Sequence, residues 1–145
     1  MAGQAKKRVL ILCTGNSCRS QMAEGWVRHD LGDRVEVRSA GTTPCFVHPL
    51  AIQVMAEAGV DISGHRSKSV EEFIQQKFDL VITVCDSARE ACPILPGASK
   101  MIHEPIPDPV IYTFSGDYAE EKFREARDLI RERIVPRVRR ELNLA

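Results

Sequence analysis

The sequence predicts an α/β fold, a three-layer sandwich whose central four-stranded parallel sheet is covered on both faces. The first observation is that apolar strand-like runs alternate with helical patterns along the 145 residues. This alternation is typical of parallel sheets with right-handed connections. The second is that residues 8–12 and 80–84 are almost continuously apolar and rich in β-branched side chains. Strands that are buried on both faces of a sheet have this pattern.

Strands and helices are expected to follow one another along the chain. The strands are expected at residues 8–12, 35–39, 80–84 and 99–103. The helices are expected at residues 20–31, 49–58 and 69–75, with a last one from Asp117 through Ile134. In the longer helical ranges the apolar side chains recur at the spacing of one helix face, whereas the strand ranges are short apolar runs.

Residues with strong boundary preferences set the ends of these helices. Pro49 stands at a favourable first helical position, and Gly59 marks the end of the same helix. Asp117 and Glu120 have the spacing of a capping box at the start of the last helix. Pro136 is expected to kink or end that helix, because proline cannot complete the helical hydrogen bonds.

Charge and hydropathy restrict the class of partner. Twenty basic and twenty acidic side chains cancel, and no basic stripe with interleaved aromatic residues is present. We therefore expect neither nucleic acid nor a membrane as the main partner. The N-terminus has no apolar signal-peptide core, and no apolar run approaches the ~18 residues that span a bilayer. The five cysteines are an odd number, which argues against a disulfide framework. We expect one cytoplasmic, monomeric domain over residues 1–145.

An anion-binding loop is predicted between the first strand and the first helix. Backbone N–H groups at such a turn can converge on one tetrahedral oxyanion, and Arg19 can bind two of its oxygens. The same donors favour the thiolate of Cys13, which makes it a nucleophile. The residues expected to bind substrate are Thr14, Gly15, Asn16, Ser17, Cys18, Arg19 and Ser20. The alternative is that Cys13 is only a buried apolar residue.

Two further cysteines follow the expected strand at residues 80–84. If the strands that end at Cys13 and Cys85 are neighbours, about 4.8 Å apart, their thiols lie near disulfide range. A helix over residues 86–91 would keep Cys92 roughly 10.5 Å from Cys85, so a bond between these two requires unwinding. Three thiols at one edge suit a redox relay that reduces the oxyanion. Buried structural cysteines are the alternative, and the cysteine spacing does not fit zinc, so no metal is expected.

Asp108 is the candidate general acid. It lies between two prolines in the loop after the last strand, at the sheet edge expected to carry Cys13. A turn-forming aspartate is the alternative interpretation. His48, expected at a helix entry, and Cys45, in the loop before it, are assigned no role.

Four segments resemble the thioredoxin-coupled arsenate reductases, and the likeness runs from residue 8 to the last helix. The segments are CTGNSCRSQMAEG at residues 13–25, Ser39-Ala40-Gly41, residues 85–96 with their two cysteines, and Asp108-Pro109. That family shares its fold and anion loop with the low-molecular-weight protein tyrosine phosphatases. The resemblance therefore implies a low-molecular-weight phosphatase-like fold.

The resemblance also implies a reaction sequence. Cys13 would attack bound arsenate, and Asp108 would assist the loss of an oxygen. Cys85 would then attack Cys13 and release arsenite, and Cys92 would next form a disulfide with Cys85. Reduced thioredoxin would clear that disulfide, so no bound cofactor is implied, and phosphate or sulfate would compete with arsenate.

Two other functions stay open, and the chain departs from the family pattern at two places. A phosphatase would use Cys13, Arg19 and Asp108 through a phosphocysteine, and a regulatory module would bind the oxyanion without turnover. Some members of the reductase family bind a potassium ion beside the anion loop. At two of the positions that bind this ion, the present chain has Arg66 and Lys68, so we predict that a basic side chain replaces the cation. The segment at residues 110–116 looks longer than in the reductases and is expected to form a wall or lid.

Overall fold

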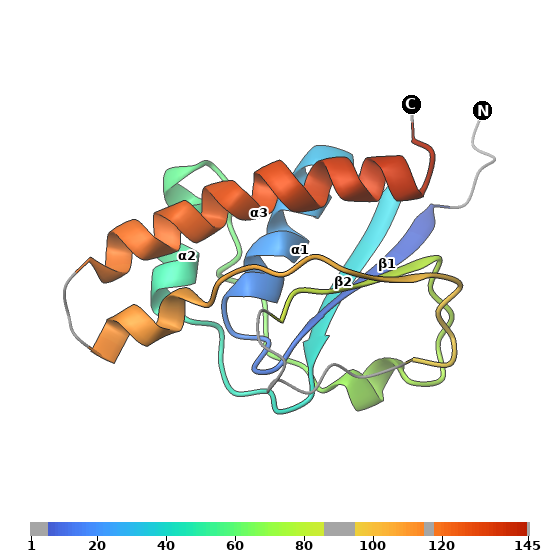
Figure 1. Cartoon of the computed structure of the whole chain (residues 1–145), viewed down its shortest axis with the longest axis horizontal. Helices are drawn as coiled ribbons and strands as arrows, with labels where there is room; N and C mark the ends of the chain where they lie inside the picture. Colours follow the sequence, from blue (N-terminus) through green and yellow to red (C-terminus); the bar gives the residue numbers. More distant parts are fainter. Residues whose placement is uncertain (1–5, 86–94, 115–117, 145) are drawn as a thin grey trace.

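The computed structural model describes residues 6–85, 95–114 and 118–144, and Figure 1 shows their arrangement. The elements are β1 (Lys7–Cys13), α1 (Arg19–Leu31), β2 (Val35–Gly41), α2 (Pro49–Glu57), the 3-10 helix η1 (Val70–Phe73), β3 (Leu80–Thr83), β4 (Met101–His103), the 3-10 helix η2 (Pro109–Phe114) and α3 (Ala119–Glu141). Within the described ranges, no helix is long and apolar enough to cross a membrane.

The four strands form one parallel sheet in the order β2-β1-β3-β4, which confirms the predicted α/β fold. Leu12 near the end of β1 pairs with Ala40 of β2 and Thr83 of β3. The strands before Cys13 and Cys85 are therefore neighbours, which meets the condition on which the proximity of these two cysteines depended. Because parallel strands end at the same edge, the loops after β1, β2 and β3 meet there.

The two faces of the sheet have different covers. Side chains of β1 such as Val9 and Ile11 pack against α1, α2 and α3 in the larger core, and α3 lies along α1 (Figure 1). On the opposite face, Leu10 and Leu12 pack with Phe73 of η1 in a smaller core. Helical elements therefore lie on both sides of the sheet, as a three-layer sandwich requires.

The helix expected at residues 69–75 is a single 3-10 turn, η1, so that prediction is wrong in extent and type. The Ser69 hydroxyl accepts a hydrogen bond from the backbone N–H of Glu71 at 3.2 Å and caps the turn. Phe73 is the one buried side chain of η1. One apolar anchor holds one turn, whereas a longer helix needs an apolar face repeated over several turns.

Pro136 was expected to kink or end the last helix, and the second alternative is wrong, because α3 continues through Pro136 to Glu141. Pro136 and Glu132 are both exposed, so water can bind the Glu132 carbonyl that the proline ring leaves without a helical donor. Val138 is buried beyond the proline and extends the apolar face. The expected cap Asp117 lies outside the described residues.

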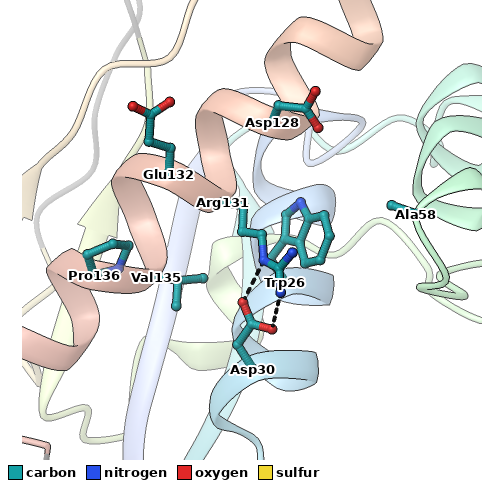
Figure 2. A pocket seen from close by; sticks show the side chains of 8 residues that line it. All are labelled: Trp26, Asp30, Ala58, Asp128, Arg131, Glu132, Val135 and Pro136. Atoms are coloured by element: carbon teal, nitrogen blue, oxygen red, sulfur yellow. Dashed lines mark hydrogen bonds and ion pairs between the residues drawn. The ribbon is translucent and has the colours of Figure 1, made fainter.

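The packing of α3 on α1 is fixed by an aromatic and ionic contact (Figure 2). The Arg131 guanidinium lies 4.3 Å from the centre of the Trp26 ring and makes two bonds of 3.0 Å to the Asp30 carboxylate. The indole N–H of Trp26 donates to the Arg127 carbonyl at 3.0 Å. These contacts hold α1, whose first residue is Arg19, in a fixed position beneath α3.

Candidate active site

Cys13 ends β1 at the floor of the site and accepts hydrogen bonds from the following loop. The backbone N–H of Asn16 donates to its sulfur at 3.2 Å, and the Ser20 hydroxyl lies 2.9 Å from that sulfur. Ser20 Oγ also accepts a bond from the Asn16 side-chain amide at 2.8 Å, which leaves its own proton for the sulfur. Both groups are therefore placed to donate to the Cys13 sulfur.

Asn16 fixes the shape of the loop. Its backbone has a φ of 47°, in the left-handed region that asparagine tolerates better than most residues. Its buried amide nitrogen donates to Ser20 and Ser39, and its amide oxygen accepts from Gln21 Nε2 and the Lys68 N–H, all at 2.8–2.9 Å. This side chain uses both donors and both lone pairs, so the network holds one loop conformation.

The chain that follows β2 orients the loop carbonyls. The backbone bonds run from Thr43 to Thr14 (2.9 Å), from Cys45 to Gly15 (3.1 Å) and from His48 to Ser17 (3.0 Å). Gly41 is required at the start of this contact, because a Cβ there would lie 2.4 Å from the Thr14 oxygen. The Gly15 carbonyl belongs to the same peptide group as the Asn16 N–H, and the two point in opposite directions. The bond from Cys45 to this carbonyl therefore directs the Asn16 N–H toward the Cys13 sulfur, to which it donates.

Arg19 joins the loop to the ends of the neighbouring strands. The guanidinium is buried and donates to the carbonyls of Ile106 at 3.2 Å and Val84 at 3.4 Å. Its Nη2 atom lies 3.5 Å from a carboxylate oxygen of Asp108. The backbone N–H of Val110 donates to the other oxygen of Asp108 at 3.0 Å. The structure thus brings together the predicted clamp and the predicted acid.

Cys18 differs from Cys13 although both lie in the loop. Burial, the Asp108 carboxylate and Cys13 raise the pKa of the Cys18 thiol well above its usual value. The protonated sulfur lies 3.7 Å from Asp108 Oδ1 and donates to it. A buried, protonated thiol bonded to Asp108 is suited to packing the loop and not to nucleophilic attack.

Beneath the loop lies a buried ion pair between Lys68 and Glu24. Their charged atoms are 3.8 Å apart, and the Ser39 hydroxyl donates to the same Glu24 oxygen at 2.5 Å. Burial opposes ionisation of Glu24, but the bonds from Arg28 and Ser39 and the charge of Lys68 outweigh it, so the pKa of this carboxyl is lowered. Arg66 instead pairs with Glu72 on the surface at 2.7 Å.

The Lys68 ammonium lies beside Glu24, where a basic side chain was predicted from the sequence to replace a bound cation. Within the described ranges, no group of three histidine, cysteine or carboxylate side chains is placed to hold a metal ion.

A pocket of about 460 Å³ opens above Cys13. Its lining residues are Cys13, Thr14, Gly15, Ser17, Cys18, Arg19, Cys45, Phe46, His48, Asp108, Val110, Thr113 and Phe114. The segment expected as a wall contributes three of these residues from η2. Tyr112 faces a second, smaller pocket beside Lys122, and residues 115 and 116 lie outside the described ranges.

Three of the lining residues, Cys45, Phe46 and His48, were assigned no role from the sequence. They belong to the chain after β2, and β2 pairs with β1. The rule that ligands bind beyond the carboxyl ends of parallel strands points to this segment, once the strand order is known.

Cys85 is buried two residues after the end of β3, at the sheet edge that carries Cys13. It follows Val84, whose carbonyl accepts a bond from Arg19 and whose N–H donates to the Leu12 carbonyl at 2.9 Å. Neither Cys13 nor Cys85 forms a disulfide in this structure. The predicted third cysteine, Cys92, lies outside the described residues.

Comparison with known proteins places this chain in a family. Residues 8–143 match the family described as low molecular weight phosphotyrosine protein phosphatase. An arsenate reductase of Halalkalibacterium halodurans is 43% identical over 129 residues, which cover 89% of this chain and 93% of that protein.

Solved structures agree with this match. An arsenate reductase in the phosphate binding state has a TM-score of 0.79 and 32% identity, covering 96% of this chain and 99% of that chain. A thioredoxin-dependent arsenate reductase of Corynebacterium glutamicum has a TM-score of 0.65 and 31% identity, covering 90% of this chain and 61% of that one. The chain belongs to the low molecular weight phosphotyrosine protein phosphatase family, and within it, as its sequence predicted, its relatives include arsenate reductases.

Proposed function

We propose that this protein reduces arsenate to arsenite through Cys13, Cys85 and Cys92 and is regenerated by thioredoxin. The observation that carries the proposal is the position of Cys85, which follows the strand next to the one that ends in the nucleophile. A phosphatase has no use for a second thiol at this place. The relatives described as arsenate reductases, one of them thioredoxin-dependent, support the same activity.

In the first step, arsenate binds to the loop N–H groups and Arg19, and the Cys13 thiolate attacks the arsenic atom. An S–As bond forms, and one oxygen leaves as water after it has received protons. Asp108 is the group placed to supply a proton, because it lies beside Arg19 at the pocket wall.

In the second step, Cys85 attacks the sulfur of Cys13. A disulfide forms and the S–As bond breaks, and its electron pair stays on arsenic, which leaves as arsenite. The two thiols are oxidised by two electrons while arsenic is reduced from the pentavalent to the trivalent state. Cys92 then attacks Cys85 and releases Cys13, and reduced thioredoxin reduces the resulting Cys85 to Cys92 disulfide.

The test is arsenate-dependent NADPH oxidation coupled through thioredoxin and thioredoxin reductase. The wild type should turn over continuously, whereas Cys13→Ser and Cys85→Ser should release no arsenite. Cys92→Ser should release one arsenite per chain and then stop. Continuous reduction by Cys92→Ser would refute the three-cysteine relay.

The phosphatase alternative is tested in the same set of variants with an aryl phosphate. Cys13, Arg19 and Asp108 compose a site that could hydrolyse a phosphate ester through a phosphocysteine. If aryl phosphate is hydrolysed rapidly and arsenate is not reduced, the phosphatase function replaces the proposed one. If Cys85→Ser loses arsenate reduction but still binds phosphate, the thiol relay is supported.

A further inference from the structure

His48 caps a helix through one nitrogen of its imidazole ring, and the other ring nitrogen takes no part in this cap. It is the N-cap of α2, and its Nδ1 accepts a hydrogen bond from the backbone N–H of Leu50 at 3.1 Å. Serine, threonine, aspartate and asparagine usually provide this cap. An imidazole provides the same acceptor and carries a second nitrogen, Nε2, on the other side of the ring.

The cap determines which nitrogen carries the proton. Because Nδ1 accepts a hydrogen bond, the proton of the neutral ring is on Nε2, which is then a donor. Burial lowers the pKa of His48, and the nearby Asp108 carboxylate only partly opposes this, so the neutral ring predominates at pH 7. Within residues 6–85, 95–114 and 118–144, no side chain or carbonyl forms a hydrogen bond with Nε2.

The ring is held in place against the anion loop. Its centre lies 4.8 Å from that of Phe123 and 5.9 Å from that of Phe46. The backbone N–H of His48 donates to the Ser17 carbonyl at 3.0 Å, which ties the residue to the loop itself. A donor fixed in this way does not lose rotamer entropy when a ligand binds.

We infer that His48 is a further oxyanion-binding residue, whose Nε2–H donates to an oxygen of the anion that points away from the loop. His48 lines the same pocket as Cys13, Arg19 and Asp108. The loop N–H groups and Arg19 bind the oxygens on the inner side of a tetrahedral anion, so an outer oxygen needs a donor from the pocket wall. This inference rests on the proposed use of the pocket for arsenate.

The test is phosphate binding by isothermal titration calorimetry in the wild type and in His48→Asn. Asparagine retains the N-cap, so the melting temperature should stay close to that of the wild type, while the wall donor is lost. We expect the Kd for phosphate and the KM for arsenate each to rise roughly tenfold, as for one charge-assisted hydrogen bond. The matched control is His29→Asn, since His29 is a half-exposed residue of α1 outside the pocket, and it should leave both constants unchanged.

A second measurement on the wild type does not depend on the folding of the variant. Nitrogen-15 chemical shifts should identify Nδ1 of His48 as the unprotonated nitrogen and should show the Nε2–H signal moving on addition of phosphate. Equal phosphate affinity in His48→Asn, or an Nε2–H signal that phosphate does not move, would overturn the role of His48 alone. Absence of phosphate binding in the wild type would overturn the proposed oxyanion site as well.

Discussion

The anion loop has an inner side, packed on Asn16, Glu24 and Lys68, and an outer side, which faces the pocket above Cys13. The residues on the two sides differ in burial and in how many of their polar groups form hydrogen bonds. On the inner side, Asn16 uses all its side-chain hydrogen bonds, and Glu24 and Lys68 form an ion pair with less than a tenth of either residue exposed. On the outer side, the pocket wall includes Phe46, 57% exposed, and Phe114, 86% exposed.

This difference separates two requirements of the proposed reaction. The loop N–H groups must keep one geometry, which the buried network provides. The space above Cys13 must admit an oxyanion and then a second thiol, which requires an open wall. Changes on the outer side should therefore alter turnover, and changes on the inner side should alter stability first.

The largest effect on the outer side is expected for Asp108→Asn. Loss of the general acid should lower kcat for arsenate by about 10²–10⁴-fold, because the departing oxygen is no longer protonated. The Kd for phosphate should not weaken, since a negative charge beside the anion is removed. Steady-state kinetics and calorimetry test this, with the exposed Asp33→Asn as control; a kcat close to that of the wild type would exclude the acid role.

Arg19→Lys is the next largest change. A lysine retains the charge but cannot bind two oxygens in one plane, and it cannot reproduce the bonds to both Val84 and Ile106. We expect kcat/KM for arsenate to fall by about 10²–10³-fold. The control Arg66→Lys concerns a guanidinium on the surface and should behave as the wild type. Comparable kinetics for Arg19→Lys and this control would show that the clamp is not needed.

On the inner side, Lys68→Met should reduce stability rather than chemistry. Glu24 pairs with both Lys68 and Arg28, so the substitution removes one of its two positive partners. We expect a loss of only about 2–3 kcal/mol in the free energy of unfolding, because Arg28 remains bonded to Glu24. Urea denaturation measures it, and Lys100→Ala, a half-exposed lysine, is the control.

The same site predicts how the protein responds to salts. The wild type should melt at the same temperature in potassium and sodium chloride, because Lys68 already neutralises Glu24. Lys68→Ala should gain thermal stability from potassium or ammonium ions, since they can enter the space left by the side chain. A wild-type melting temperature that rises in potassium alone would contradict the built-in cation.

The smallest expected effect is the pH dependence that Glu24 contributes. The pKa of this carboxyl is lower in the folded protein than its usual 4.5. Its ionised form therefore stabilises the fold above about pH 4.5, and this contribution is lost as the pH falls through the lower folded-state pKa. Glu24→Gln should lower stability at pH 7 by on the order of 1 kcal/mol and flatten the acid limb of the stability curve. Parallel acid limbs for both proteins would contradict this assignment.

The sequence predicted the parts of this molecule that local patterns determine. The anion loop was predictable because the residues from Cys13 to Ser20 follow an apolar strand-like run directly and precede a helical pattern. The apolar runs before Cys13 and Cys85 predicted strands that are buried on both faces of the sheet. The continuation of the last helix past Pro136 was not predictable from the proline alone, because it depends on whether the proline lies on the solvent-exposed face of the helix. The length of η1 was not predictable either, because it depends on how many of its side chains are buried against the sheet.

Residues that reach the site through tertiary structure were not found. His48 and Phe46 line the pocket because β2 lies beside β1. The order of strands in a sheet cannot be predicted from the sequence of any one segment. Arg66 and Lys68 are two residues apart in a stretch without regular structure, where spacing alone does not decide which side chain turns inward. The structure assigns the inner position to Lys68, where its ammonium meets Glu24.

The bond from Arg19 to the Val84 carbonyl has a consequence for the way the site is coupled together. The predicted anion clamp is held by the peptide immediately before Cys85, so a shift of that peptide would also shift the guanidinium. The place where an anion would bind and the place where the second thiol lies are thus joined through one side chain.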